Sequence, residues 1–447
     1  METPIVDFVR SYAQSGTARL HMPGHKGQAY LGPEALDITE VCGADALYEA
    51  DGIIAASEKN AASLFGSGHT FYSCEGSSLA IRAILYLLCV HAARRGLGRT
   101  ILAARNVHKS FVHACALLDV DVRWLYGANG SCLWSDPVSP EQLETALSSG
   151  PLPMAVYVTS PDYLGQMCDI AGLSRVCRTF GVPLAVDNAH GAYLHFLKTP
   201  LHPLDLGAQL CCDSAHKTLP ALTGAAYLHI SKEADPVFSP LARDALSLFG
   251  STSPSYLILQ SLDLCNRVLA GPFPEKLSQL IPQLSEMRSH LSSAGLPVLD
   301  GEPMKLTLDT GRMGLPGRSA AQALREQGIE AEFADDRFLV MMPSPDTPAR
   351  DLQRLESALL LLRGRPGHLP SLPPLRPLQR ALSIRDAVLS AHRRVPLKEA
   401  EGKICALPTV SCPPAIPIAV SGERFDADAL RLLSAFGIEQ VDIVEEA

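Results

Sequence analysis

The sequence predicts an α/β protein with a mostly parallel sheet covered by helices, followed by a smaller α+β domain. Strand-like apolar runs alternate with helical patterns up to about residue 281, which is typical of strands joined by crossover helices. From about Pro282 the strands become fewer and the helices longer. The 447 residues, 47% hydrophobic and 19% charged, are enough for a large buried core.

Composition narrows the functional classes. The net charge of −9 without a basic run argues against a nucleic-acid partner and mildly favours a cationic substrate. The twelve cysteines show no paired zinc-like spacing, so we expect buried thiols in a reducing cytosol and no metal site. No apolar run reaches membrane-span length, and METPIVDFVRSYAQ lacks a signal-peptide core. We therefore expect a cytoplasmic protein without a membrane partner.

The elements follow from local periodicity. Residues 4–15 form an amphipathic helical pattern, with Ile5, Phe8, Val9 and Tyr12 on one face. Further helices are predicted at 76–93, 140–149, 173–180, from Tyr256, from Pro282, and at 320–327 and 349–362. Strands are predicted at 101–104, 154–159, 183–187, 209–213, 225–230, 305–308 and 338–342.

These elements group into five predicted parts. They are an N-terminal arm (1–30), a large cofactor-binding domain (31–281), a small α+β domain (282–364), a proline-rich linker (365–378) and a C-terminal segment (379–447). For the last segment we expect one helix and an irregular stretch, CPPAIPIAVSGERF.

The main chemical signal is an acid at a strand end followed by an isolated lysine. Asp187 closes the apolar run that begins at Pro183, and Lys217 lies in the later loop SAHKTLP. A pyridoxal phosphate enzyme needs such a pair, because the lysine forms a Schiff base with the cofactor and the acid keeps the pyridine nitrogen protonated. Each residue alone has a plainer interpretation, as a solvated surface lysine or a helix cap.

Two polar turns are candidate phosphate sites. Gly76, Ser77 and Ser78 open an apolar helix, whose N-terminal N–H groups and hydroxyls suit an anion. Ser251 belongs to the second turn, FGSTSPSY. Ordinary serine capping explains the first turn equally well, and a polar triplet such as the second is more often just a capping turn.

Histidine-containing loops complete the set of candidates. His108 follows the predicted strand 101–104, where ligands gather in an open α/β sheet, and it could stack on a flat cofactor or be purely structural. The loop HMPGHKG, residues 21–27, is either a Gly/Pro turn or a binding loop.

Taken together, the motifs HMPGHKG, RNVHKS, DNAHGAY and SAHKTLPALTG resemble the ornithine/lysine/arginine decarboxylase family, in its short bacterial form without an N-terminal wing domain. VPLKEAEGKI and PPAIPIAVSGE extend the resemblance to nearly the whole chain. The resemblance implies an aspartate-aminotransferase-like fold, pyridoxal 5'-phosphate as cofactor, an amino acid substrate, a role in polyamine biosynthesis and a homodimer or higher homo-oligomer.

The resemblance also implies residue roles. Lys217 forms the internal aldimine, Asp187 pairs with the ring nitrogen, and His108 stacks on the ring. The phosphate is held by Gly76, Ser77, Ser78, Ser214 and His216, with Ser251 supplied by the partner subunit. His190 also belongs to the cofactor set, and HMPGHKG crosses the dimer interface.

The sequence departs from the family pattern around the substrate. Ala44-Asp45 stands where the family has two aspartates, Glu75 replaces an asparagine, DNAHGAY replaces DEAHGAH, and CPPAIP replaces YPPGIP. The cofactor set is intact, whereas the substrate surroundings have changed.

The expected reaction is decarboxylation of a basic amino acid through a Lys217 aldimine and a quinonoid, with Lys217 or His216 returning the proton. Glu40, Asp45 and Glu49 are candidates for binding a cationic substrate end. Two alternatives stay open. One is an aminotransferase or other lyase, with Arg312 or Arg318 binding the substrate carboxylate, and the other is a non-catalytic paralogue.

Overall fold

The structure is a computed structural model that describes residues 1–127, 137–364, 373–408 and 416–445. Most of the predicted linker and the start of CPPAIP lie outside the described residues. Tertiary contacts divide the chain into two compact units. Unit 1 comprises Met1–Leu102, Leu147–Val158 and Ile170–Pro274, and unit 2 comprises Ala103–Ala146, Thr159–Asp169 and Glu275–Ala447. The five predicted domain boundaries stay predictions.

The central sheet has seven strands in the order β1-β7-β6-β5-β4-β2-β3. Their bounds are β1 (His69–Ser73), β2 (Thr100–Ala104), β3 (Asp121–Leu125), β4 (Val156–Thr159), β5 (Leu184–Asp187), β6 (Leu210–Asp213) and β7 (Ala226–Ile230). β5 and β6 are parallel, whereas β7 is antiparallel to both β6 and β1. The predicted α/β class with a mostly parallel sheet is confirmed. β1 was not predicted from the sequence.

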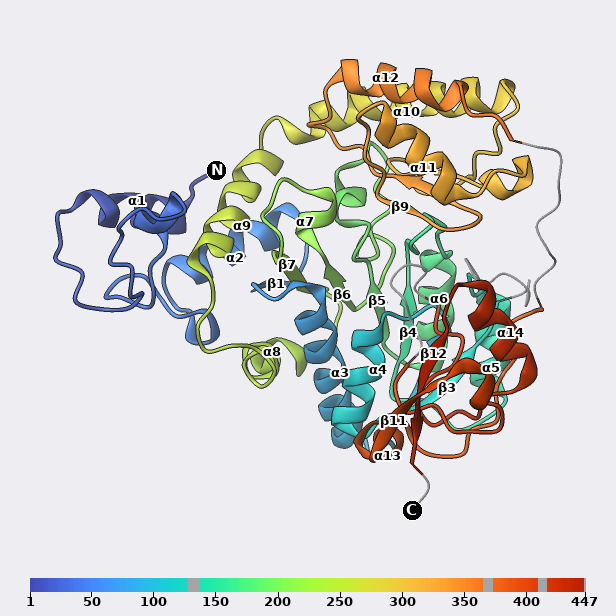
Figure 1. The fold of residues 1–447 in the computed structure, drawn as a ribbon. Helices are drawn as coiled ribbons and strands as arrows, with labels where there is room; N and C mark the ends of the chain where they lie inside the picture. Colours follow the sequence, from blue (N-terminus) through green and yellow to red (C-terminus); the bar gives the residue numbers. More distant parts are fainter. Residues whose placement is uncertain (128–136, 365–372, 409–415, 446–447) are drawn as a thin grey trace. The chain divides into compact units, whose positions relative to one another are not determined.

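The helices of unit 1 are α1 (Pro4–Gln14), α2 (Ile53–Leu64), α3 (Gly76–Arg94), α6 (Ile170–Phe180), α7 (Ala215–Thr218), α8 (Phe238–Ser247) and α9 (Tyr256–Leu269), with 3-10 turns at Pro33–Leu36, Leu47–Glu49 and Ala192–Phe196. In unit 1, α3 packs on β6 and β7, whereas α1 lies away from the strands, against α2 and α9 (Figure 1). α1 is fixed by α9, because Asp263 accepts the N–H groups of Ile5 (2.9 Å) and Val6 (3.0 Å).

The helix α3 corrects the expectation that no apolar run reaches membrane-span length. By length and composition, its 19 residues could cross a membrane, with a mean hydropathy of 1.5. However, 61% of that stretch is buried within the fold, where α3 contacts α8, β6 and β7. Packing in the core of unit 1 therefore accounts for its apolar sequence.

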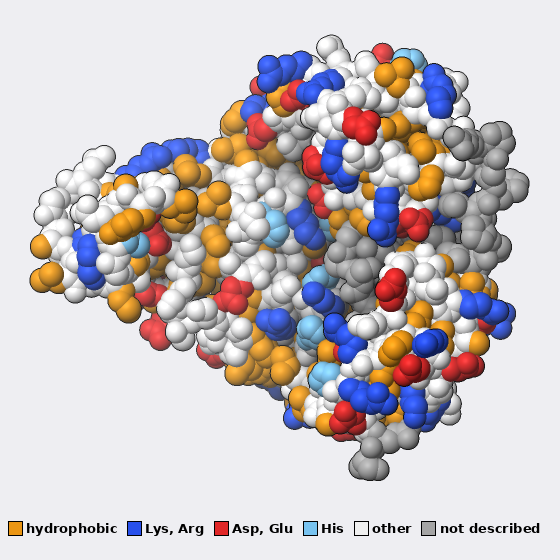
Figure 2. Space-filling model, in the orientation of Figure 1, with side chains coloured by type: hydrophobic (Ala, Val, Ile, Leu, Met, Phe, Trp, Pro, Cys, Tyr) orange, Lys and Arg blue, Asp and Glu red, His pale blue; other side chains and the backbone are white. Residues whose placement is uncertain are grey.

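The N-terminal arm exposes apolar side chains. Figure 2 shows hydrophobic side chains gathered over the region that Figure 1 labels α1. Four of them follow α1 in the chain: Leu20, Met22, Tyr30 and Leu31 are 95%, 71%, 85% and 88% exposed. We call these four residues the arm patch. A contiguous exposed apolar patch marks an interaction surface.

Unit 2 contains two smaller sheets. One is three-stranded, in the order β8 (Leu306–Leu308), β10 (Leu339–Met341), β9 (Phe333–Ala334), and the other pairs β11 (His392–Pro396) with β12 (Gln440–Val444). The helices are α4 (Lys109–Leu118), α5 (Pro140–Ser148), α10 (Phe273–Ser293), α11 (Gly317–Glu326), α12 (Ala349–Leu360), α13 (Ile384–Leu389) and α14 (Ala427–Ala435), with short 3-10 turns at Thr310–Met313 and Leu397–Glu399.

Two expectations for this part of the chain are wrong. α10 begins at Phe273 rather than at Pro282, which lies inside the helix. Proline is common in the first helical turn, so the sequence pattern placed the start too late. The C-terminal segment has two helices and a strand pair where one helix was expected, because β11 and β12 pair across more than forty intervening residues. The described part of CPPAIPIAVSGERF, residues 416–425, is irregular as expected.

A buried ion pair holds the C-terminal segment within unit 2. Arg105, at the end of β2, donates two hydrogen bonds of 2.7 Å to Glu423, and the two side chains are 1% and 7% exposed. Arg105 also donates to the carbonyls of Pro417 (3.1 Å) and Ile418 (3.2 Å). The family-like motif PPAIPIAVSGE thus supplies the partners of the arginine in RNVHKS.

Candidate active site

Lys217 and His190 meet at one edge of the sheet in unit 1. Lys217 lies on the short helix α7 directly after β6, and His190 lies in the turn after β5. The Lys217 Nζ and His190 Nε2 atoms are 3.0 Å apart. β5 and β6 are parallel neighbours, so their carboxyl ends deliver both residues to the same edge. Lys217 is exposed, whereas His190 is buried.

Asp187, the last residue of β5, is a buried acid at this edge. It is 2% exposed, and its Oδ1 atom accepts hydrogen bonds from the Ala189 N–H (3.1 Å) and the Cys212 thiol (3.6 Å). Burial raises the pKa of Asp187, and the positive charge of Lys217 opposes that rise. A buried carboxyl of raised pKa is suited to holding a proton or a cationic group.

A polar cradle opens helix α3. The Ser214 hydroxyl donates to the Ser77 hydroxyl at 2.9 Å, which joins the N-cap of α7 to the first turn of α3. Gly76 has φ +68°, a left-handed conformation that glycine adopts without strain. Ser78 lies in the same first turn and is partly exposed. The N-terminus of this 19-residue helix, with two hydroxyls beside it, has the donor chemistry of a phosphate site.

The remaining predicted site residues lie as follows. His216, on α7, uses Nδ1 in a 2.9 Å hydrogen bond with the Ala225 carbonyl. The Ser251 N–H donates to Glu75 Oε1 of the same chain at 2.6 Å, so the second polar turn lies beside the start of α3. His108 belongs to unit 2, where it caps α4: its Nδ1 atom accepts from the Ser110 N–H at 3.2 Å. Its stacking on a cofactor stays a prediction.

A buried group centred on Asp213 was missed by sequence reasoning. Asp213 Oδ2 lies 3.0 Å from His202 Nε2 and 3.2 Å from His229 Nε2, and Asp213 Oδ1 accepts from Asn188 Nδ2 at 2.7 Å. The four residues are fully buried. We call them the Asp213 cluster. A signal was available, because an aspartate directly before the lysine loop, inside an apolar strand, calls for polar partners.

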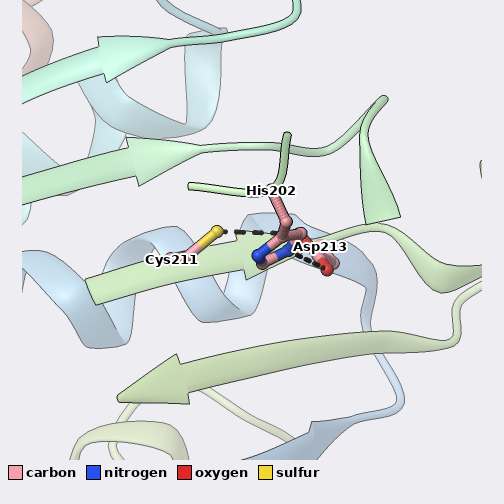
Figure 3. Close-up of side chains that lie close together, drawn as sticks. All are labelled: His202, Cys211 and Asp213. Atoms are coloured by element: carbon pink, nitrogen blue, oxygen red, sulfur yellow. Dashed lines mark hydrogen bonds and ion pairs between the residues drawn. The ribbon is translucent and has the colours of Figure 1, made fainter. Parts of the chain in front are cut away.

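The Asp213 cluster also bears on the expectation of no metal. The ligand atoms of His202, Cys211 and Asp213 lie within 4.8 Å of one another (Figure 3). The same side chains already hydrogen-bond to one another: His202 lies 3.0 Å from Asp213 Oδ2, and the Cys211 thiol, outside the cluster as defined, lies 3.6 Å from Asp213 Oδ1. Burial raises the pKa of the Cys211 thiol far above its ordinary value, which disfavours the thiolate that metals bind.

Two further groups of candidates are engaged in structural contacts. The Asp45 carboxylate accepts five backbone N–H groups around the start of α2, from Ala46, Asp51, Gly52, Ile54 and Ala55. In unit 2, Arg312 pairs with Asp309 at 3.0 Å and Arg318 pairs with Asp336 at 3.4 Å. Asp45 is therefore a helix cap, and both arginines have acidic partners.

The cysteine expectation can be checked for the described part of the chain. Ten cysteines fall there; all ten are free, and eight are buried. Cys42 is exposed and Cys74 is partly exposed.

The fold is that of a class of proteins, the fold-type I pyridoxal phosphate enzymes. The structure is similar to a lysine decarboxylase from Francisella novicida (TM-score 0.81, 18% identity, 99% of this chain and 81% of the other). It is also similar to a serine palmitoyltransferase from Sphingomonas wittichii (TM-score 0.55, 14% identity, 80% of this chain and 82% of the other). At these identities the likeness shows the fold alone.

Sequence comparison identifies the family. The major domain of the Orn/Lys/Arg decarboxylases matches residues 3–297, and their C-terminal domain matches residues 377–440. The chain belongs to the Orn/Lys/Arg decarboxylase family and is a decarboxylase. Among its relatives is an arginine decarboxylase of Bacillus subtilis, 29% identical over 94% of this chain and 91% of the relative. The constitutive lysine decarboxylase of Escherichia coli is 25% identical over 58% of this chain and 37% of the relative.

Proposed function

We propose that this protein decarboxylates a basic amino acid, arginine, lysine or ornithine, with pyridoxal 5'-phosphate as its cofactor. One observation carries the proposal: Lys217 Nζ lies 3.0 Å from His190 Nε2 at the sheet edge where β5 ends in the buried Asp187. Membership of the decarboxylase family supports it.

The residues present fit this cofactor. When bound, pyridoxal phosphate supplies an aldehyde for amines and a ring that accepts the electrons of the broken bond. Lys217 offers an exposed amine for the aldehyde. Asp187, whose pKa is raised by burial, would hold a proton at the ring nitrogen. Ser77 and Ser214, with the N-terminus of α3, would bind the phosphate.

Lys217 is the better of the two predicted proton donors to the substrate Cα atom. His216 uses Nδ1 in its hydrogen bond with the Ala225 carbonyl, which commits one side of its ring. Lys217 Nζ instead contacts His190, whose ring nitrogen can exchange a proton with the amine. We therefore assign the return of the proton to Lys217, with His190 as its partner.

Around the substrate, this sequence has one acid fewer than the family pattern, because Ala44 stands where the family has an aspartate. Asp45 is saturated by backbone N–H groups, which leaves Glu40 and Glu49 as the predicted acids for a cationic group. We propose arginine as the first substrate to test, because the relatives that align over most of the chain include several named arginine decarboxylase.

We further propose that the chain acts as a cytoplasmic homodimer in polyamine biosynthesis. The arm patch offers four apolar side chains that are at least 71% exposed, next to the HMPGHKG loop, and a second copy would cover them. Substituting Leu31 by Asp should then shift the protein to monomers in light scattering, whereas Leu361→Asp, a control in unit 2 that is 65% exposed, should leave the dimer intact. A wild-type monomer would contradict the proposal.

The aminotransferase alternative is weaker. It needs an arginine for the substrate carboxylate, and both predicted arginines lie beside acids in unit 2. Formation of pyridoxamine phosphate on mixing with an amino acid would favour this alternative over carbon dioxide release.

The function is tested by carbon dioxide release with arginine, lysine, ornithine and neutral amino acids. We expect release with a basic amino acid, and loss of both activity and the visible absorbance of bound cofactor in Lys217→Ala. Lys198→Ala, an exposed lysine of the same unit, is the control. Visible absorbance of cofactor joined covalently to the protein, if it survives in purified Lys217→Ala, would refute the assignment.

A further inference from the structure

The Asp213 cluster contains a buried carboxylate whose two oxygens both have hydrogen-bond partners, next to the proposed site in the chain. Asp213 is 0% exposed and has four partners. Asn188 Nδ2 and the Cys211 thiol donate to Oδ1, and the imidazoles of His202 and His229 meet Oδ2. In Figure 3 the side chains of His202 and Cys211 point toward Asp213.

The protons of the two imidazoles can be assigned from their other contacts. His202 Nδ1 accepts the Leu204 N–H at 3.3 Å, so Nε2 carries the proton that is donated to Asp213. Burial lowers the pKa of His229, so its ring is neutral, and it donates from Nε2 while Nδ1 accepts from the Thr70 hydroxyl at 2.8 Å. With two neutral rings, the negative charge of the cluster is not cancelled.

Asp213 therefore stays ionised although it is buried. Burial alone would raise its pKa, but the interactions with His202 and His229 bring the pKa well below its ordinary value. A carboxylate that accepts several hydrogen bonds keeps its charge even in the interior.

The cluster joins the segments that carry the proposed catalytic residues. Asn188 follows Asp187 in the chain, and Asp213 precedes Ser214 and the Lys217 turn. His229 lies on β7, where it pairs with Cys211 across the antiparallel ladder. One carboxylate thus fixes the ends of β5 and β6 to each other and to β7.

The cluster also acts on Asp187 through its charge. Burial is the main cause that raises the pKa of Asp187, Lys217 lowers it, and the charge of Asp213 adds a smaller rise. A like charge nearby strengthens the hold of a carboxylate on a proton or a cationic partner. Asp213 has donors of its own, so its charge supports Asp187 rather than competing for the same partner.

We propose that Asp213 is a positioning residue of the active site, a buried and fully hydrogen-bonded carboxylate that sets the Asp187 and Lys217 segments against each other. This inference rests on the proposed function, since it concerns the cofactor site.

The test compares Asp213→Asn with the wild type as holoenzymes. The amide keeps the size of the side chain but removes the charge and offers one acceptor oxygen in place of two. We expect cofactor affinity, measured by absorbance titration, to fall by about tenfold or more, as when the orienting partner of a metal ligand is lost. The pH midpoint of the visible band should move to lower pH, because less negative charge remains to favour the protonated form.

Asp205→Asn is the matched control. It removes the Asp205–His195 pair (2.8 Å), another aspartate–histidine contact of unit 1, and should leave cofactor affinity and the pH midpoint unchanged. If Asp213→Asn does not fold, His202→Gln removes one imidazole while keeping the carboxylate. It should weaken cofactor binding several-fold with a smaller shift of the pH midpoint.

The outcomes separate the two proposals. Failure of the wild type to bind pyridoxal phosphate would overturn the proposed function and the inference with it. Normal binding by the wild type, with unchanged affinity and pH midpoint in Asp213→Asn, or in His202→Gln if that is the variant used, would overturn the inference alone. One equivalent of zinc in the wild type that is absent from the variant would also overturn it, since the cluster would then be a metal site.

Discussion

Removing one partner of the Arg105–Glu423 pair should destabilise unit 2 strongly. Both side chains are nearly inaccessible, and the guanidinium meets the carboxylate through two 2.7 Å hydrogen bonds. Burial lowers the pKa of Arg105, but Glu423 more than reverses this, so the net pKa is raised. In Glu423→Gln, Arg105 keeps its charge and loses its ionised partner.

The magnitude follows from the loss of a buried partner. Breaking a buried ion pair on one side costs about 3–5 kcal/mol, because the remaining charge is left unpaired. Glu423 also accepts the Val420 N–H at 2.8 Å, a contact that the amide oxygen of glutamine can retain. For a folding unit of 150–250 residues, 1 kcal/mol corresponds to about 2–4 °C, so the melting temperature should fall by about 6–20 °C.

Thermal unfolding followed by circular dichroism measures this change. The double variant Arg105→Met/Glu423→Leu removes both charges and should recover much of the lost stability, because no unpaired charge stays buried. Arg394→Ala is the control, since Arg394 pairs with Asp442 at 3.0 Å on the surface and should cost less than about 1 kcal/mol. A melting temperature within about 2 °C of the wild type in Glu423→Gln would refute the reasoning.

Three further predictions concern unit 1. Burial raises the pKa of Glu58 to about 7 despite its contact with Arg243, so unfolding free energy should fall by about 3 kcal/mol as pH rises from about 4.5 to 7. Urea titrations at several pH values should show that the unfolding free energy of Glu58→Gln depends less on pH than that of the wild type. Equal pH dependence in the two proteins would contradict this. Asp45→Ala should lower stability by at least about 1–2 kcal/mol through loss of the α2 cap, whereas a neutral result in thermal melts would show that the cap is dispensable. The Gly224 carbonyl accepts the Gly76 N–H at 2.8 Å, so Gly224 supports the start of α3. Gly224→Ala should weaken cofactor binding more than Gly76→Ala, since of the two only Gly224 would bring a Cβ atom against backbone, 3.0 Å from the Cys74 carbonyl oxygen. Equal cofactor affinities in absorbance titrations would refute the steric argument.

The sequence by itself predicted the elements with strong local signals. The α/β alternation, the end of β5 at Asp187, the lysine turn after β6 and the apolar helix after Gly76 are local patterns, and the structure has each of them. The pairing of β11 with β12 depends on distant partners and escaped the sequence analysis. The start of α10 was placed too late because Pro282, inside the helix, looked like a first-turn proline. Local propensity does not register contacts between segments far apart in the chain.

The candidate site also has a part that the sequence predicted and a part that only the structure revealed. Lys217 and Asp187, the residues for cofactor chemistry, could be predicted because each lies at or just after the end of an apolar strand pattern. Only the tertiary structure placed His190 on the lysine, used Asp45 as a helix cap and gathered two histidines around Asp213. The physical reason is desolvation: a polar side chain in an apolar strand predicts that partners exist, but folding alone selects which distant groups supply them.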